Sequence, residues 1–568
     1  MVSVSAFRNS ALRTPHSALF LFAIACALAV CAASWRHTGS LAFPIDDGYI
    51  YSNYVLSASQ GEAFVYNSGQ SSGGITGLGW FALCVAAYWL LAPLHGLLGG
   101  LAPIEVQAVS QGLAQQAGHL YLAAYLPGVL CLALTAVGVY RLAQLSLPEA
   151  VRNTRARDLV CVSLGMIAAA DLGLVWGALS GLEVALSSAL AVWAVALLLS
   201  DVRRGWLRWS LLPIALLPWA RPDLLAISAA CGLWLLVRAL SSSRSERGIG
   251  IRNIFTYAGA VAGGLAMMCA IYYAGWGQPL PSSFYAKVGG LRSGAKVLSA
   301  IQELMIAGRA LPFVAAGLAL MGGLVGLLPS SRRPVASGRG EDTASANGAR
   351  HEARWAALLL LMVSTFYVLA LMLTLPWFGQ EDRYLLPLHP FLIVLVGMLI
   401  WRIVGLFPVD RLLAIPGFRP IVLLGAALIL VGGDYIWATR EYAVEVRNIR
   451  DAHVLPALWI AANTPPDSVI ASEPIGAVRL FSGRRTVDLV GLTTPATLGT
   501  YRDWPRAWPA LRSAGATHLF FYPAWFDEGE PPPWAVELQQ FSILDNRIAG
   551  SDVIAVYRLD WAQFSGTR

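Results

Sequence analysis

Long apolar runs separated by short polar stretches dominate the first three quarters of the chain. Each run of roughly 18 or more apolar residues can cross a hydrocarbon core of about 30 Å as a helix. The pattern predicts an all-α, polytopic membrane domain over residues 1–440. About eleven spans are expected, at residues 17–35, 119–143, 159–175, 183–200, 206–220, 222–240, 253–275, 305–328, 355–375, 384–404 and 419–437.

The apolar runs become short after residue 440. Alternation of short strand-like runs with helical stretches is typical of an α/β domain. We therefore expect residues 441–568 to form a soluble α/β domain. Its strands are predicted at 469–471, 486–490, 518–522 and 553–557, with helices at 454–463 and 505–514.

Arginines concentrate in every second loop between the predicted spans, near residues 152–157, 203–208, 238–252 and 332–354. Cytoplasmic loops of membrane proteins carry an excess of positive charge. The N-terminus is therefore expected inside, and the C-terminal domain outside, in a multi-pass protein of the bacterial inner membrane. Within the last of these loops, Ser330 to Glu352 lack an apolar period, which indicates a flexible cytoplasmic linker.

The first outer loop is expected at residues 36–118, and it contains a further apolar stretch at 74–98. Counting that stretch as a crossing would place the arginines at 152–157 outside. We therefore predict interfacial helices in this loop, which suits aromatic residues such as Trp80 and Trp89.

Composition agrees with a membrane protein. Of the 568 residues, 57% are hydrophobic and only 13% are charged, far from the balance of a soluble globular protein. The net charge of +7 is spread between spans and does not form one basic stripe, so we expect membrane lipids and no nucleic acid as partners. All seven cysteines lie in apolar segments, so no disulfide or cysteine-based metal cluster is expected.

Two adjacent carboxylates, Asp46 and Asp47, lie a few residues beyond the first predicted span. Charges at that depth cost free energy unless they are paired or used. A carboxylate at an interface can accept the proton of an attacking hydroxyl group, and adjacent aspartates can bind a divalent cation such as Mg²⁺ or Mn²⁺. A helix cap or a solvated turn is the alternative interpretation.

The stretch that begins at Asp46 is DDGYIYSNYVLSASQGEAFVYNSGQSSGGITGLGW. It resembles the first outer loop of the C-type (GT-C) glycosyltransferases, especially the branch of mycobacterial cell-wall arabinofuranosyltransferases. In that superfamily a first-loop aspartate is the catalytic base, and the resemblance implies that role for Asp46 or Asp47. Gly48 and the step Gly74-Ile75 depart from the usual pattern.

Shorter matches to the same superfamily follow in the expected order and on the predicted outer face. They are Ser180-Gly181-Leu182-Glu183, Arg221-Pro222-Asp223, residues 278–287 ending in FYAK, and residues 383–390 reading RYLLPLHP. The resemblance implies substrate contacts by residues of these motifs and of the first loop, namely Tyr51, Tyr54, Glu183, Asp223, Tyr285 and Tyr384.

Lys287 is one of only two lysines in the chain, and both lie in one predicted outer loop. An ammonium group there could bind the phosphate of a lipid-linked donor, and Arg383 and Arg221 could fork onto its oxygens. The alternatives are snorkelling of Lys287 to lipid headgroups and structural ion pairs of the arginines with Asp223 or Asp382.

These observations predict an inverting glycosyltransferase that moves a sugar from a polyprenyl-phosphate donor to a glycan, lipid or protein acceptor outside the membrane. The resemblance suggests a pentose such as arabinofuranose. A transporter or lipid flippase is the main alternative, although such proteins tend to carry repeats and ionisable groups near the bilayer midplane. A non-catalytic assembly protein is a third.

Overall fold

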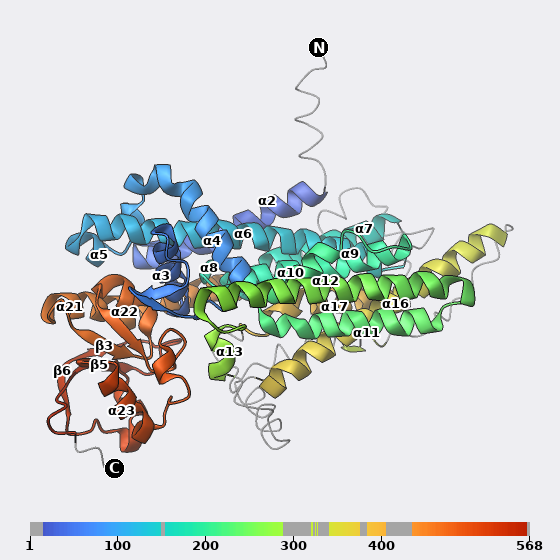
Figure 1. Cartoon of the computed structure of the whole chain (residues 1–568). Coiled ribbons are helices and arrows are strands. Elements are labelled where there is room, and N and C mark those ends of the chain that lie inside the picture. Colours follow the sequence, from blue (N-terminus) through green and yellow to red (C-terminus); the bar gives the residue numbers. More distant parts are fainter. Residues whose placement is uncertain are drawn as a thin grey trace.

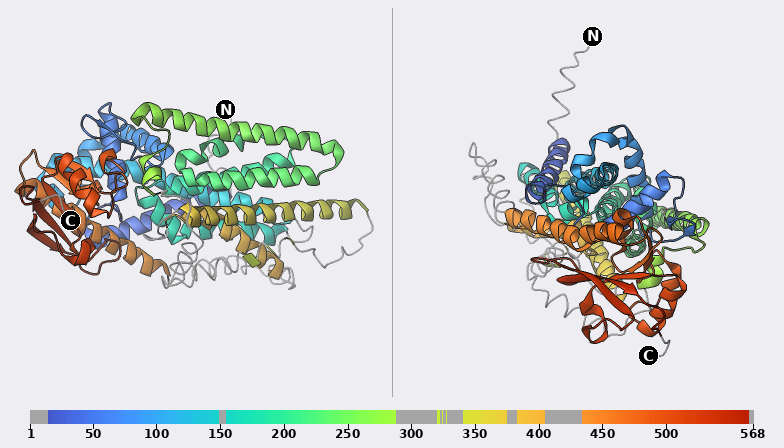
Figure 2. Two further views of the ribbon diagram at one scale, coloured as in Figure 1. Left: turned by 60° about the horizontal axis from the view of Figure 1, so that its bottom comes forward. Right: turned by 90° about the vertical axis from the view of Figure 1, so that its left-hand side faces the viewer.

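The computed structural model describes residues 15–148, 154–287, 340–374, 383–404 and 434–564, together with four isolated residues between 320 and 327. An elongated bundle of helices carries an α/β domain at one end, next to the segment that follows the first helix (Figure 1). Figure 2 shows the same arrangement from two further sides, with the sheet beside the end of the bundle.

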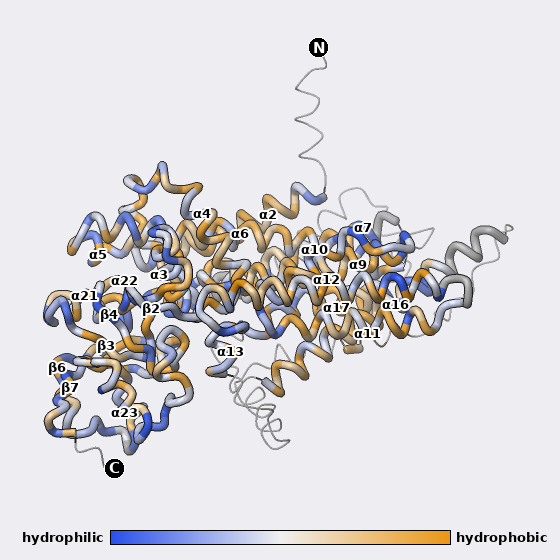
Figure 3. Tube along the Cα trace, viewed as in Figure 1, coloured by the Kyte–Doolittle hydropathy of each residue, from blue (hydrophilic) through white to orange (hydrophobic). Residues whose placement is uncertain are grey.

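The bundle helices are rich in alanine, leucine and valine, and Figure 3 shows hydrophobic residues along most of their length. Because a helix satisfies its own backbone polar groups, such segments are stable in lipid, where water cannot do so. The long helices are α2 (Pro15–Thr38), α6 (Gln111–Ser146), α7 (Thr154–Ala170), α9 (Val184–Arg203), α11 (Leu225–Ser241), α12 (Arg244–Trp276), α16 (Gly340–Thr374) and α17 (His389–Val404). The chain is a multi-pass membrane protein.

Seven helices in the described part are long and apolar enough to cross a membrane, or eight if a bent pair is one span. That pair joins α7 to α8 (Leu172–Leu179) at an angle of 47°. The predicted span at 206–220 is wrong in extent, because α10 covers only Leu211–Ala220. Ten residues rise about 15 Å, too little to cross a bilayer. Most of the predicted spans at 305–328 and 419–437 lies outside the described residues.

The predicted flexible linker is also wrong over its second half, because α16 begins at Gly340. This segment continues the apolar helix that follows it and lacks proline, so nothing in the sequence interrupts the helix. Within it, Glu352 pairs with Arg238 at 2.6 Å and with Arg203 at 3.4 Å, which joins α16 to α11 and α9.

The first loop folds into short elements between α2 and α6. They are α3 (Asp47–Ser59), β1 (Val65–Asn67), β2 (Gln70–Ser71), α4 (Leu78–Leu91), the 3₁₀ turns Ala92–Leu97 and Gly99–Leu101, and α5 (Ile104–Val109). By length and composition the stretch Leu78–Leu97 could itself span a membrane. Large apolar side chains such as Leu90, Leu97 and Ile104 are more than two-thirds exposed, as lipid contact requires, and the interfacial placement stays a prediction.

The α/β domain follows α20 (Asp434–Ile449) and contains a five-stranded sheet in the order β4-β3-β5-β7-β6. The strands β4, β3 and β5 are parallel, and β7 runs antiparallel to both of its neighbours, β5 and β6. Four strands confirm the prediction: β3 (Val469–Ser472), β4 (Arg485–Asp488), β5 (His518–Phe521) and β7 (Val553–Leu559). The sequence missed β6 (Ala535–Ser542), an edge strand whose residues are mostly exposed and polar.

Helices cover both faces of the parallel strands. On one face, Ile470, Phe520 and Val556 pack with Val478 of α22 (Ile475–Ser482) and Ile460 of α21 (Leu455–Asn463). On the other face, α23 (Trp504–Ser513) buries Trp504, Trp508 and Leu511 against Ala471 and Leu519. The predicted fold class, a helical membrane domain with an α/β domain, is confirmed.

Candidate functional site

Asp46 directly precedes α3 and faces the α/β domain. Its carboxylate accepts hydrogen bonds from the backbone N–H groups of Gly476 at 2.7 Å and Ala477 at 3.0 Å. Both N–H groups belong to the first turn of α22, where the helix dipole favours a negative charge. Asp46 is buried. Through these two bonds it caps a helix that lies more than 400 positions away in the sequence.

Three more first-loop side chains hold the same edge of the domain. The Asn53 amide donates to the Gly476 carbonyl, and the Tyr66 hydroxyl donates to the Ile475 carbonyl, both at 2.9 Å. Asn67 donates to the Thr486 carbonyl at 2.9 Å and accepts from the Thr486 N–H at 3.0 Å. The Asn67 amide therefore pairs with the edge strand β4 as another strand would.

His453 also lies next to Asp46, in a single π-helical turn at Arg450–Val454. Its Nδ1 is 3.2 Å from an Asp46 carboxylate oxygen, and its Nε2 is 2.7 Å from the Tyr522 hydroxyl. π-helical turns often accompany functional sites. Here the turn adds a third contact between Asp46 and the α/β domain.

Asp47 faces the membrane bundle. Its carboxylate accepts a hydrogen bond of 2.7 Å from Nη1 of Arg383, and its side chain is 33% exposed, against 10% for Asp46. The Arg383 Nε atom is buried and has no hydrogen-bond partner in the described part of the chain. The structure thus brings together two of the predicted site residues, and it leaves an arginine N–H available to an anion.

Behind this pair lies a second ionic group. Arg221 forms a two-pronged ion pair with Asp223, at 2.7 and 3.0 Å, and is 3.8 Å from Glu183. Glu183 in turn accepts a hydrogen bond of 2.9 Å from the Tyr51 hydroxyl. The ring of Tyr384 contacts both guanidinium groups, with its centre 4.6 Å from Arg221 and 5.2 Å from Arg383. Five predicted site residues therefore lie in one network with Arg383.

Tyr51 and Tyr54 are buried and serve the shape of the loop. Tyr51 accepts a hydrogen bond from the Gly77 N–H at 2.7 Å, and Tyr54 bonds Ser72 at 2.7 Å and accepts from the Gly74 N–H at 3.0 Å. Because both hydroxyls already have protein partners, direct contact with a substrate stays a prediction.

The structure explains Gly48, one of the two departures from the superfamily pattern. A Cβ on Gly48 would lie 2.6 Å from the Ser180 carbonyl oxygen, so this position has no room for a side chain. In the step Gly74-Ile75, the other departure, Ile75 is buried, and a Cβ on Gly74 would lie 2.5 Å from the Tyr54 hydroxyl.

The predicted outer loop that contains residues 278–287 lies beside the first loop. Its helix α13 (Ser282–Lys287) begins with the Ser282 N–H bonded to the Gly73 carbonyl at 2.9 Å, and Ser283 bonds Thr76 at 2.8 Å. Tyr285 is 37% exposed and packs edge-on against Trp276, with 6.1 Å between ring centres. Lys287 ends the helix, and its side chain lies outside the described part.

Sequence reasoning missed Glu473, which follows β3 and is partly exposed. Burial of its carboxyl group, together with the negative charges of Asp47, Asp46 and Asp488, raises the pKa of Glu473 to about 8. The available signal was its position directly after a buried strand, at the carboxyl end where α/β domains place ligands. Asp488 itself accepts hydrogen bonds from the N–H groups of Val490 and Thr493.

The described residues contain no group of three or more histidine, cysteine, aspartate or glutamate side chains placed to hold a metal ion. Asp46 and Asp47 point to different partners, α22 and Arg383, and so do not present their oxygens together. The divalent cation remains a prediction, and no step below depends on one.

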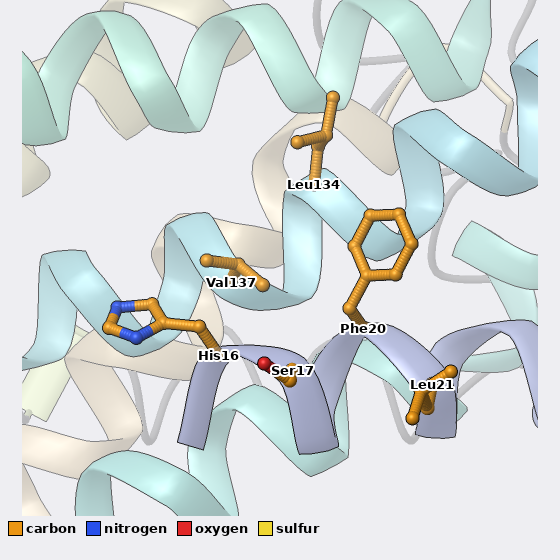
Figure 4. Close-up of a pocket in the computed structure, with 6 residues that line it drawn as sticks. All are labelled: His16, Ser17, Phe20, Leu21, Leu134 and Val137. Atoms are coloured by element: carbon orange, nitrogen blue, oxygen red, sulfur yellow. The ribbon is translucent and has the colours of Figure 1, made fainter. Parts of the chain in front are cut away.

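A pocket of about 390 Å³ lies between α6 and the start of α2, whereas Asp46 follows the other end of α2 (Figure 4). Its lining is almost entirely apolar, with Phe20, Leu21, Leu134 and Val137 beside His16 and Ser17. It offers no carboxylate, so it is not the candidate site.

The chain is similar to solved structures of membrane proteins. For ArnT from Cupriavidus metallidurans in the apo state the TM-score is 0.53 at 12% identity, with coverage of 94% of this chain and 97% of that one. For ArnT bound to undecaprenyl phosphate the TM-score is 0.50 at 13% identity, with coverage of 96% of this chain and 99% of that one. The chain has the GT-C fold.

A third GT-C neighbour is the archaeal oligosaccharyltransferase AglB from Archaeoglobus fulgidus, in complex with an inhibitory peptide and a dolichol-phosphate. Its TM-score is 0.50 at 12% identity, with coverage of 94% of this chain and 74% of that chain. Residues 444–561 match a domain of unknown function, DUF8728. A search of curated proteins finds no sequence that matches.

Proposed function

We propose that the protein is a glycosyltransferase that uses a polyprenyl-phosphate sugar as its donor. The observation that carries the proposal is the ion pair between Asp47 and Arg383, which lies beside the α/β domain in a chain of GT-C fold. The pair puts a proton acceptor and a phosphate ligand within one site, and glycosyl transfer from a lipid phosphate requires both.

In this mechanism Asp47 is the general base and Asp46 positions it. The Asp47 carboxylate accepts the proton of an acceptor hydroxyl group, whose oxygen attacks the anomeric carbon of the donor. The bond between that carbon and the phosphate oxygen breaks, and the polyprenyl phosphate leaves with the electron pair. A single displacement of this kind inverts the configuration at the anomeric carbon.

Arg383 stabilises the departing phosphate. It is buried, it keeps a free Nε–H in the described structure, and a guanidinium binds phosphate oxygens through paired hydrogen bonds. Arg221 adds positive charge behind Tyr384. Lys287 is proposed as a further phosphate ligand because it ends the helix α13, which is anchored to the first loop.

The lipid part of the donor is supported by the neighbours, since one ArnT structure holds undecaprenyl phosphate and the AglB structure holds a dolichol-phosphate. We propose that the sugar is a pentose such as arabinofuranose, on the strength of the first-loop resemblance. We place the site on the outer face of a bacterial inner membrane because of the distribution of arginines.

The test is a transfer assay with purified full-length protein in lipid nanodiscs. The substrates are synthetic undecaprenyl-phosphate sugars, including β-arabinofuranose, and a panel of octyl glycosides, long-chain alcohols and short hydroxyl-containing peptides. We expect one molecule of undecaprenyl phosphate to be released for each glycosidic bond formed, with inversion detected by NMR. Movement of intact donor across the bilayer without cleavage of this bond would instead identify a flippase.

A further inference from the structure

The parallel strands of the α/β domain have a topological switch point, the place where ligands of such domains usually bind. The chain runs from β3 through α22 to β4 on one side, and then through α23 to β5 on the other side of β3. Because α22 and α23 cover opposite faces, the connections diverge between β3 and β5. In open α/β sheets ligands bind at this point, outside the carboxyl ends of the strands.

The residues that follow these strand ends face the proposed base. Glu473 follows β3, and Tyr522 follows β5. Three residues after Glu473, the Gly476 N–H binds Asp46, the neighbour of Asp47. Tyr522 reaches the same aspartate through His453, at 2.7 and 3.2 Å. The switch point of the sheet and the membrane site therefore lie next to each other.

The side chains near this switch point have the composition of a sugar-binding surface. Tyr501 and Trp525 are partly exposed aromatic residues, and the guanidinium of Arg502 lies 5.4 Å from the first ring and 4.9 Å from the second. Aromatic faces pack on sugar rings, while carboxyl and guanidinium groups bond their hydroxyls. Neither a hydrocarbon chain nor an extended apolar peptide would need this set of polar groups.

We propose that the region outside the carboxyl ends of β3 and β5 binds a glycan acceptor, and that Glu473 contacts an oxygen of the acceptor sugar next to the hydroxyl group that Asp47 deprotonates. This inference rests on the proposed function and names its acceptor class. It makes the α/β domain part of the active site, since the acceptor would lie between a carboxyl group from each part of the chain.

The charges around Glu473 define the form in which it acts. Asp47, Asp46 and Asp488 surround it with negative charge, Arg502 opposes them, and Tyr501 and Tyr522 complete the set. At neutral pH Glu473 is protonated, because its pKa is raised to about 8. It then donates a hydrogen bond to the acceptor and does not repel Asp47. Two carboxyl groups held in different protonation states are typical of acid–base sites.

The experiment measures steady-state transfer by the full-length protein, using the undecaprenyl-phosphate sugar that the wild type accepts and octyl glycosides as acceptors. Glu473→Ala should raise the acceptor KM about tenfold or more and leave the donor KM unchanged, because it removes one hydrogen bond on the acceptor side. Glu537→Gln, at an exposed position on β6, is the matched control and should behave as wild type.

A pH profile separates this role from a structural one. Wild-type kcat/KM should fall as pH rises above about 8, where Glu473 loses its proton, while Glu473→Gln keeps a donor and should lose that decline. An unchanged acceptor KM in Glu473→Ala would overturn the proposal. A decline of kcat/KM at alkaline pH that persists in Glu473→Gln would also overturn it, and this test still applies if the alanine variant does not fold. Transfer to peptides or alcohols alone, and not to glycosides, would overturn it as well. Absence of transfer by the wild type would instead contradict the proposed function.

Discussion

The two carboxylates at the start of α3, those of Asp46 and Asp47, are adjacent in sequence but lie in different surroundings. On the side of the α/β domain, Asp46 is buried, and its oxygens accept two backbone hydrogen bonds and lie close to His453. On the side of the bundle, Asp47 is one-third exposed and pairs with Arg383. The first side is closed and holds structure, and the second is partly exposed.

This difference shows how one Asp-Asp pair can serve two purposes. Successive residues at the start of a helix point about 100° apart, so adjacent side chains can face different partners. The fixed position of Asp46 on α22 also fixes the backbone that carries Asp47. The position of Asp47, the proposed base, therefore depends on the docking of the α/β domain.

The largest effect is expected at the partly exposed side. Asp47→Asn should reduce transfer by roughly 100-fold to 10,000-fold, because the amide keeps the shape and loses the ability to accept a proton. The measurement is kcat with saturating donor and acceptor. Asp552→Asn, at an exposed position, is the control. Near-normal transfer by folded Asp47→Asn would exclude this residue as the base.

A smaller loss is expected for Arg383→Gln, of about 100-fold in kcat, because a charged hydrogen-bond donor to the leaving phosphate is removed. The donor KM should rise as well. Arg506→Gln, whose native side chain is 68% exposed, should leave both constants unchanged. If Arg383→Gln altered only the acceptor KM, the phosphate role would be wrong.

A modest effect is expected at the closed side for Asn67→Ala. The loss of both bonds to Thr486 should lower the free energy of unfolding by about 1 to 3 kcal/mol, since buried backbone groups of β4 lose their partners. Hydrogen exchange should increase at Thr486. Asn463→Ala, at an exposed helix end, should change neither quantity. Unchanged exchange at Thr486 in Asn67→Ala would contradict the docking role.

Much of the fold was predictable because it depends on local pattern. Apolar runs indicated most of the membrane helices, and four of the five strands of the α/β sheet carried buried β-type runs. The extent of α10 and the helical start of α16 were not predictable in the same way. A composition window detects apolar content, but where a helix begins or ends depends on packing.

The candidate site was predictable only in part. Motifs identified Asp47, Arg383 and Arg221, and the structure places them in neighbouring ion pairs. Sequence spacing did not separate the roles of Asp46 and Asp47, because the partner of Asp46 is Gly476, 430 positions away. Glu473 was missed because its significance comes from the sheet order.

The most direct test compares Asp46→Asn with Asp47→Asn in the same preparation. The amide that Asp46→Asn introduces accepts fewer N–H groups than the carboxylate and lacks its charge. This variant should therefore lose about 1.5 to 3 kcal/mol of stability and keep measurable transfer while folded. Asp47→Asn should keep its thermal stability and lose transfer. The account is contradicted if Asp46→Asn abolishes transfer at unchanged stability while Asp47→Asn remains active.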